Sequence, residues 1–231
     1  MSINRPFPPG GLAVDRVWEV VRRLMNYYEA RWRPNEPDPF KVLIRAILSQ
    51  NTSFKNEIEA FRRLEAGLGV DPKALSQASE EEIAKYIRVA GLHRQKSKKI
   101  REIARIVIER YDGDLSKVLS LPLEEARREL MSLPGVGAKT ADVVLLFSAG
   151  RPVVPVDRHI FRIARRLGLV PRNAGYEEVR SVIEGDVPPK YREDAHVLLI
   201  QFGRDYCRAR KPRCEECIIG DLCPKIGVKK S

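Results

Sequence analysis

The four cysteines of this 231-residue chain all lie near its C-terminus, within 17 residues. They follow the spacing C-x6-C-x2-C-x5-C and are Cys207, Cys214, Cys217 and Cys223. Disulfides suit small secreted domains, and zinc sites usually pair two CxxC motifs, whereas this chain has only one. Four thiolates from one short loop suit the four irons of a [4Fe–4S] cluster. We therefore expect a [4Fe–4S] cofactor, with structural zinc as the alternative.

A second candidate site surrounds Lys139, in the segment LPGVGAKTAD at residues 133–142. Gly135 and Gly137 allow a tight turn with positive φ, and a helix can begin directly after it. N–H groups at that helix N-terminus can donate to phosphate oxygens. We therefore expect Gly135, Val136 and Gly137 to contact a DNA backbone without reading its sequence. The alternative is an ordinary turn between two helices.

Lys139 itself falls in the first turn of that helix, where the helix dipole disfavours a cation. The same field, with partial desolvation, favours the neutral amine. A neutral amine can attack an electrophilic sugar carbon and form a Schiff base. The alternative is a surface lysine that binds phosphate.

Asp157 is the carboxylate that could act with Lys139, in the segment VVPVDRH at residues 153–159. Eighteen residues and a Gly-Arg-Pro break separate the two side chains, so they are predicted to lie on different helices. The carboxylate could stabilise positive charge developing on a deoxyribose ring or deprotonate a nucleophile. An aspartate before a helix is more often an N-cap, and Asp157 could serve both purposes.

The elements that position these residues are predicted to be helices. Apolar residues recur every three or four positions in most segments, and period-two alternation is nearly absent, so the fold class is all-α. The prolines at 34, 37 and 39 predict a linker after the first helix. The expected helices cover residues 12–32, 40–49, 58–68, 80–90, 97–111, 123–133, 136–149, 159–167, 176–185 and 189–206.

Composition and charge restrict the class of protein further. Hydrophobic residues make up 43% and charged residues 32%, which permits a packed core and excludes a wholly disordered chain. No apolar run approaches the ~18 residues of a membrane span, and prolines near the start do not suit a signal peptide. The net charge of +11 favours a polyanionic partner, of which nucleic acid is the commonest inside cells. A solvated basic surface is the alternative.

Three separated motifs together resemble one family, endonuclease III, the base-excision DNA glycosylase/AP lyases of the helix-hairpin-helix superfamily. The motifs are the Lys139 hairpin, the Val-Asp-x-His segment that ends at His159, and the block from Cys207 to Cys223. The resemblance covers roughly residues 36–224. The cysteine block is its most specific part, because the residues between the cysteines also match the family.

The resemblance implies two helical domains that flank a DNA cleft. One would be a six-helix barrel over residues 37–150, with the helix-hairpin-helix at about 123–149. The other would combine residues 1–36 and 151–231 and would carry the cluster loop at 207–223.

The resemblance also implies a mechanism. Lys139 would attack C1′ of a damaged nucleotide, expel the base and nick the strand 3′ to the abasic site by β-elimination, and Asp157 matches the family's essential carboxylate. The nucleotide must be flipped out, because C1′ cannot be reached in a stacked duplex. Gln50 would fill the vacated space, Leu92 would enter the opposite strand, and His159 would contribute to DNA binding. The structural alternatives are a helix-end hydrogen bond for Gln50 and a core position for Leu92.

The implied partner is duplex DNA with oxidised pyrimidines or abasic sites, bound by a monomer in the cytoplasm, at the nucleoid. The cluster would be structural or would modulate DNA binding. Basic side chains around it would face phosphates: Arg204, Arg208, Arg210, Lys211 and Arg213.

Two departures from the family pattern affect the expected substrate scope. Arg158 stands where a small hydroxyl residue is usual, and Ser53 where an acidic residue is common. Monofunctional thymine/uracil mismatch glycosylases share the fold and the cluster but generally lack the lysine. They are one alternative class, and a non-catalytic, cluster-bearing DNA-binding protein is another.

Overall fold

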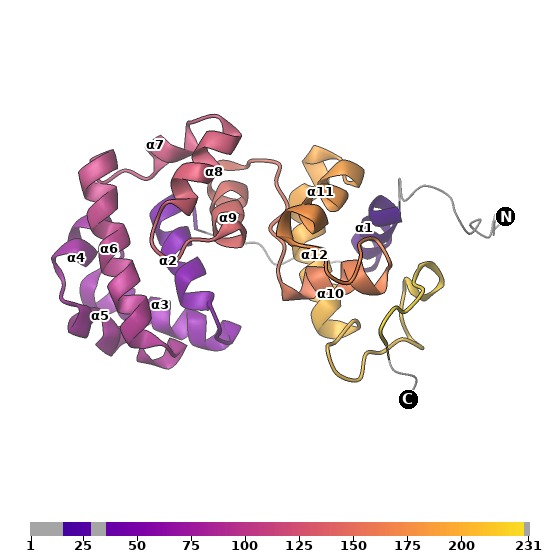
Figure 1. Ribbon diagram of the computed structural model, residues 1–231. Helices are drawn as coiled ribbons and strands as arrows, with labels where there is room; N and C mark the ends of the chain where they lie inside the picture. The colour runs from indigo at the N-terminus through magenta and orange to yellow at the C-terminus, as the bar shows by residue number, and fades with distance from the viewer. Residues whose placement is uncertain (1–15, 29–35, 229–231) are drawn as a thin grey trace. The chain divides into compact units, whose positions relative to one another are not determined.

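The computed structural model describes residues 16–28 and 36–228, and these residues form helices and no strands (Figure 1). The all-α prediction is confirmed. None of the helices in the described residues combines the length and apolar character that a bilayer span requires.

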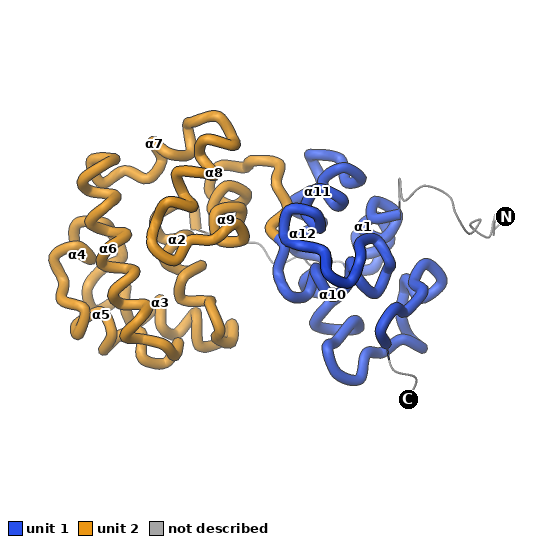
Figure 2. Tube along the Cα trace, viewed as in Figure 1, with its two compact units in different colours: residues 1–32, 156–231 blue, residues 33–155 orange. Residues whose placement is uncertain are grey.

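The chain divides into two compact units, which Figure 2 shows in different colours. Unit 1 comprises residues 1–32 and 156–231, and unit 2 comprises residues 33–155. These boundaries lie four and five residues from the ones that the family resemblance suggests.

Unit 2 contains the six helices expected there and two short ones that were not predicted, α4 and α7. A single 3-10 turn, η1, follows α5. The bounds are α2 (Pro39–Ser49), α3 (Phe54–Leu68), α4 (Pro72–Gln77), α5 (Glu80–Ile87), η1 (Arg88–Ala90), α6 (His93–Tyr111), α7 (Ser116–Leu119), α8 (Leu123–Met131) and α9 (Ala138–Ala149).

Helix α2 lies at the centre of unit 2, where it packs against α3, α6 and α9. Its residues Leu43, Ile44, Ile47 and Leu48 are fully buried. Removing each such side chain from water contributes roughly 1.5–3 kcal/mol. The hydrophobic core of this unit is formed by residues between 40 and 153, so unit 2 has a core of its own.

Pro39 is the first residue of α2 and does not belong to a linker, contrary to the prediction. Asp38 caps the helix, because its side chain accepts hydrogen bonds from the backbone N–H groups of Phe40, at 2.8 Å, and Lys41, at 3.3 Å. Proline suits the first helical position, since its missing N–H would have no partner there. Pro34, the other end of the expected linker, lies outside the described residues.

Polar caps also explain where the neighbouring helices begin. Ser53 accepts a hydrogen bond from the N–H of Asn56 and starts α3 four residues before the predicted position. Ser79 and Glu82 form a reciprocal capping box at the start of α5. The side chain of Asp71 caps α4 by accepting a hydrogen bond from the N–H of Ala74, and Pro72 is the first residue of that helix.

Unit 1 contains four α-helices in its described residues, followed by the loop that holds the cysteines. Its elements are α1 (Arg16–Tyr27), α10 (Arg158–Arg166), α11 (Tyr176–Asp186), η2 (Pro189–Tyr191), α12 (Arg192–Asp205) and η3 (Gly220–Leu222). Helix α12 packs against α10 and α1. The outer parts of the first expected helix, residues 12–15 and 29–32, lie outside the described residues.

Candidate functional site

The turn between α8 and α9 exposes its two glycines. Gly135 has φ +75°, a conformation that favours glycine. Val136 points inward: its side chain is buried, and its N–H donates to the carbonyl of Leu133 at 3.1 Å. The Val136 side chain therefore packs the turn, and the two glycines form the surface of the hairpin. The expected contact of Val136 with DNA stays a prediction.

The first turn of α9 can accept an anion. Gly137 precedes the helix without any side-chain cap, and the first turn contains no acidic residue. In the described part of the chain, the N–H groups of Gly137 and Ala138 have no acceptor. Donors of this kind, at the positive end of a helix dipole, bind phosphate oxygens. Lys139, the second residue of α9, is half-buried beside them.

A buried ion pair joins the two helices of the hairpin. Arg127 of α8 donates through Nε to Oδ1 of Asp142 at 2.7 Å and through Nη2 to Oδ2 at 3.3 Å. Asp142 is fully buried and lies three residues after Lys139 on α9. Breaking a buried pair leaves an uncompensated charge and costs about 3–5 kcal/mol. The pair therefore holds α9, and with it Lys139, in a fixed orientation relative to α8.

Gln50 lies against the hairpin. It ends α2 as the C-cap, and its side-chain Nε2 donates to the carbonyl of Gly135 at 3.1 Å. Leu92 immediately precedes α6, adopts the left-handed conformation with φ +48° and is 49% exposed. The alternative of a core position for Leu92 is therefore wrong. The alternative for Gln50, a hydrogen bond at the helix end, is present in the structure.

Lys96 was not predicted, and it joins the segments that carry Gln50 and Leu92. Lys96 is 3% exposed, and its Nζ donates to the carbonyls of Leu48, at 2.8 Å, and Ala90, at 3.0 Å. Burial lowers the pKa of Lys96, and the positive charge of Lys99 lowers it further. The two carbonyls compensate the buried ammonium and tie the end of α2 to the residues before Leu92.

A sequence signal for Lys96 does exist. The inward face of α6 is apolar at Ile100, Ile103 and Val107, and Lys96 falls on the same face one turn earlier. A lysine on an apolar face indicates a buried cation that needs acceptors, but the sequence does not show which carbonyls supply them.

Asp157 caps α10, as the structural alternative for this residue predicts. Its Oδ1 accepts hydrogen bonds from the N–H groups of His159, at 2.8 Å, and Ile160, at 2.9 Å. Asp157 is half-buried in unit 1, whereas Lys139 belongs to unit 2. Arg158, which departs from the family pattern, is the first residue of α10 and is exposed. Ser53, the other departure, is the cap of α3.

His159 links α10 to the helix that precedes the cysteines. Its Nδ1 is 3.0 Å from Nη2 of Arg162, which also donates to the carbonyls of Gly203 and Cys207. Burial lowers the pKa of His159, and the carboxylate of Asp157 partly opposes that shift. A Cβ on Gly203 would lie 2.8 Å from the Cβ of His159, so α12 approaches α10 closely at this point.

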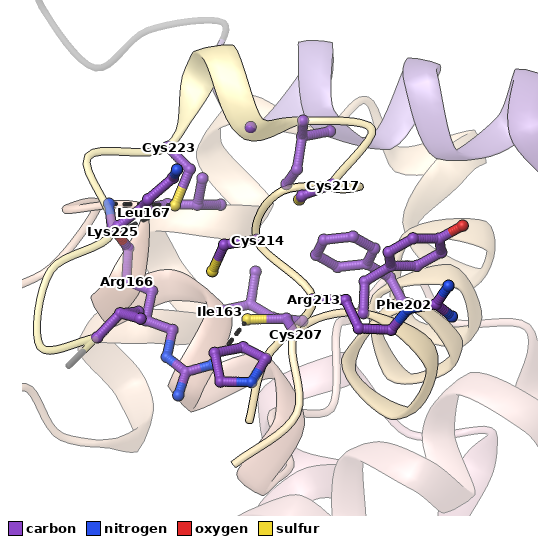
Figure 3. Close-up of a pocket in the computed structure, with 15 residues that line it drawn as sticks. Ile163, Arg166, Leu167, Phe202, Cys207, Arg213, Cys214, Cys217, Cys223 and Lys225 are labelled. Atoms are coloured by element: carbon purple, nitrogen blue, oxygen red, sulfur yellow. Dashed lines mark hydrogen bonds between the residues drawn. The ribbon is translucent and has the colours of Figure 1, made fainter. Parts of the chain in front are cut away.

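The four cysteines line one small pocket in unit 1, and Figure 3 shows their thiols together with the side chains around them. The other lining residues are mostly apolar and include Ile163, Leu167, Phe202 and Ile219. Burial raises the pKa of Cys217 and Cys223, and iron would oppose this effect because a coordinating thiol loses its proton. Among the described residues, no three His, Cys, Asp or Glu side chains form a set that would hold a single metal ion.

Hydrogen-bond donors contact the sulfurs of Cys207 and Cys223, and such contacts are common at iron–sulfur sites. Arg166 donates through Nη1 to Sγ of Cys207 at 3.3 Å and to the carbonyl of Arg208 at 2.7 Å. The backbone N–H of Lys225 donates to Sγ of Cys223 at 3.3 Å (Figure 3). Four converging thiols with N–H donors in an apolar pocket fit the donor set of a [4Fe–4S] cluster.

Two ion pairs stabilise the cysteine loop. Arg23 of α1 pairs with Asp221 at 2.7 Å, which ties the loop to the first helix. Arg213 was expected to face phosphates, but in the structure it pairs with Glu216 and lies over the ring of Tyr206.

Family comparisons agree with these features. Residues 44–189 match the model of the HhH-GPD superfamily base excision DNA repair protein, and residues 207–223 match the iron-sulfur binding domain of endonuclease III. Endonuclease III of Thermotoga maritima is 34% identical over 205 residues, which cover 89% of each chain.

Solved structures show the same similarity. The structure of a trapped endonuclease III–DNA covalent intermediate has a TM-score of 0.81 at 29% identity, covering 91% of this chain and 95% of the other. The structure of a thermostable thymine-DNA glycosylase has a TM-score of 0.79 at 26% identity, covering 91% and 96%.

The fold and the cysteine loop thus define a base excision repair DNA glycosylase of the helix-hairpin-helix superfamily. Within that superfamily, the chain belongs to the endonuclease III family of DNA glycosylase/lyases. It binds DNA and carries a [4Fe–4S] cluster.

Proposed function

We propose that this protein is a bifunctional glycosylase and AP lyase that removes oxidised pyrimidines and nicks the resulting abasic site. The observation that carries the proposal is Lys139 in the first turn of α9, beside the exposed glycines of the hairpin. A lysine that only bound phosphate is the alternative, and borohydride trapping distinguishes the two roles. The active unit is a monomer, and it acts inside the cell, on chromosomal DNA.

The chemistry proceeds through the amine of Lys139. Its nitrogen attacks C1′, the bond from C1′ to the base breaks, and the base leaves with the electron pair. Ring opening gives an imine; loss of a C2′ proton then breaks the C3′–O bond, and the 3′ phosphate departs. Water hydrolyses the imine and releases the lysine. Asp157 stabilises the positive charge that develops on the sugar or accepts the proton of the attacking amine.

The remaining residues hold the DNA. Gly135 and Gly137 allow close approach of the backbone, and the N–H groups before Lys139 bind a phosphate. Gln50 occupies the space of the flipped nucleotide, Leu92 enters the opposite strand, and His159 supports DNA binding from α10. The four cysteines would ligate the cluster, which would order their loop and leave base removal to the protein side chains.

Borohydride trapping tests the mechanism. Duplexes containing one thymine glycol or one abasic site are incubated with the cluster-loaded protein and borohydride, with Lys139→Gln and the control Lys117→Gln alongside. We expect a covalent band with the wild type and the control, and none with Lys139→Gln. A band that survives in Lys139→Gln removes Lys139 from its role.

The same experiment distinguishes the proposal from a second candidate function, that of a monofunctional thymine/uracil mismatch glycosylase. The similarity to a thermostable thymine-DNA glycosylase supports this second candidate. A monofunctional enzyme gives no covalent band, but it releases uracil or thymine from a mismatched duplex. Release without trapping from the wild-type protein overturns the lyase assignment.

A further inference from the structure

The N-terminal half of α6 carries a group of cations: Arg94, Lys98, Lys99 and Arg101, called here the α6 basic cluster. Arg94 and Lys98 are exposed and lie four residues apart, so they share a face of the helix. The cluster begins two residues after Leu92. No part of the chemistry proposed above uses it.

These cations have no partner among the residues that the structure describes. In the described part of the chain, none of the four side chains forms an ion pair or a hydrogen bond, and Nε of Arg101 is buried without an acceptor. Glu102 lies four residues after Lys98 on the same helix, yet the two do not pair. Elsewhere in unit 2, basic side chains do pair with carboxylates, as Lys41 does with Glu65 and Arg45 with Glu57.

The position of the cluster is unfavourable for an isolated protein. Helix α6 has no acidic residue in its first turn and no side-chain cap, so Arg94, the second residue of the helix, lies at the positive end of its dipole. Like charges four residues apart destabilise a helix by a further ~0.2–0.5 kcal/mol. An external anion removes both penalties.

Lys99 places the cluster next to the hairpin. A Cβ built on Gly135 would lie 2.6 Å from Cδ and 2.9 Å from Nζ of Lys99, so the end of that side chain rests against the turn. An anion that reaches the turn at Gly135 is therefore close to the ammonium of Lys99. The cations of α6 and the hairpin lie in the same unit, and one duplex can meet both.

We propose that the α6 basic cluster is a second binding site for DNA backbone phosphates, beside Leu92 and continuous with the hairpin. The proposal extends the DNA contacts given above and rests on the hairpin holding the duplex. Because the cluster contacts phosphates, it contributes affinity and orientation without sequence preference. It places cations on the stretch of backbone next to the point where Leu92 enters the duplex.

Salt-dependent binding tests the proposal. Affinity for a duplex with a stable tetrahydrofuran abasic site is measured over a series of KCl concentrations for the wild type and Arg94→Gln/Lys98→Gln. Each lost phosphate contact lowers the slope of log K against log[salt] by about 0.9, so the double variant should lose up to about 1.8. We expect binding on the order of tenfold weaker at ~0.1 M salt.

Two further variants serve as controls. Arg62→Gln/Lys73→Gln removes the same charge from α3 and α4, and it should keep most of the wild-type slope. Arg94→Lys/Lys98→Arg keeps the charge and should retain binding. If the double glutamine variant and the α3/α4 control lose the same slope, the effect is general electrostatics and the proposal is wrong.

Neutral methylphosphonate linkages locate the contact. Placed singly in either strand around the abasic site, at least one should weaken wild-type binding and have less effect on Arg94→Gln/Lys98→Gln. If every methylphosphonate linkage weakens binding by the double variant as much as binding by the wild type, the proposal is wrong. Single-turnover nicking of a true abasic site by the wild type is measured alongside. An inactive wild type would instead point to failure of the lyase assignment, since the binding assay needs no chemistry.

Discussion

At the residue scale, Asp157 caps α10 and is also the proposed catalytic carboxylate, and two substitutions separate these roles. Asparagine caps a helix about as well as aspartate does, so Asp157→Asn should change the free energy of unfolding by less than ~0.5 kcal/mol. It removes the charge, and we expect base release to slow by roughly 10²- to 10⁴-fold. Single-turnover base release and denaturant unfolding of cluster-loaded protein measure the two effects.

Asp157→Ala is the matched control, because it loses both the charge and the hydrogen bonds to His159 and Ile160. It should be about 1 kcal/mol less stable than Asp157→Asn and equally slow. If Asp157→Asn released the base at the wild-type rate, Asp157 would be a helix cap only.

His159 should titrate below the ordinary histidine value of 6.5, because burial lowers its pKa in the folded protein. The unfolded state then binds more protons as pH falls through 6.5, so this residue's contribution to stability is present above that pH and is lost below it. The chain has only three histidines, which makes NMR titration of their ring protons practical. The resonance that disappears in His159→Gln should have a midpoint below 6.5, and a midpoint at or above 6.5 contradicts the expectation.

At the element scale, the hairpin glycines differ in what surrounds them. A Cβ on Gly137 would have no neighbour within 4 Å among the described residues, and its φ of −96° suits any residue. A Cβ on Gly135 would collide with Lys99, and its φ of +75° is strained for alanine. Alanine at position 137 therefore tests the space available to DNA, whereas alanine at position 135 also strains the folded protein.

Gly137→Ala should leave the unfolding free energy within ~0.5 kcal/mol of wild type. It should nevertheless weaken duplex binding on the order of tenfold, because only DNA occupies that space. Gly135→Ala should lose roughly 1–3 kcal/mol of stability as well as binding. Thermal unfolding and fluorescence anisotropy measure the pair, and unimpaired DNA binding by Gly137→Ala would remove close backbone approach from the hairpin's role.

The elements and contacts differ in how far the sequence predicts them. The long helices follow from apolar periodicity, and Asp71-Pro72 is a local start signal that also makes α4 predictable in retrospect. Helix α7 has four residues, too few to show a period. The hydrogen bond from Gln50 to Gly135 spans 85 residues of sequence, and the bonds of Lys96 depend on two carbonyls of other elements. Such contacts are produced by packing, so no local pattern encodes them.

At the scale of the whole molecule, the cysteine loop of unit 1 differs from unit 2 in the contacts that stabilise it. Unit 2 is built around an apolar core formed by residues 40–153. The loop after α12 in unit 1 has only the short η3, and Ile219 is its one fully buried hydrophobic side chain among the described residues. Four thiols, two ion pairs, the hydrogen bonds from Arg162 and Arg166 and a few backbone hydrogen bonds must order the rest. The cluster therefore stabilises a region that has little core of its own.

Removal of the cluster should thus unfold this loop and leave unit 2 intact. After oxidative removal of iron, or in Cys217→Ser, backbone amides of residues 207–228 should exchange hydrogen at least ten times faster, equivalent to ~1.4 kcal/mol or more. Exchange in α2 to α9 should stay as it is, because the core of unit 2 contains no residue of the loop. Hydrogen exchange with mass spectrometry resolves the two regions.

The control variant is Asp221→Asn, which breaks the ion pair with Arg23 and keeps all four cysteines. Its amides in residues 207–228 should show a much smaller increase in exchange. An equal increase would mean that the ion pair, and not the cluster, orders the loop.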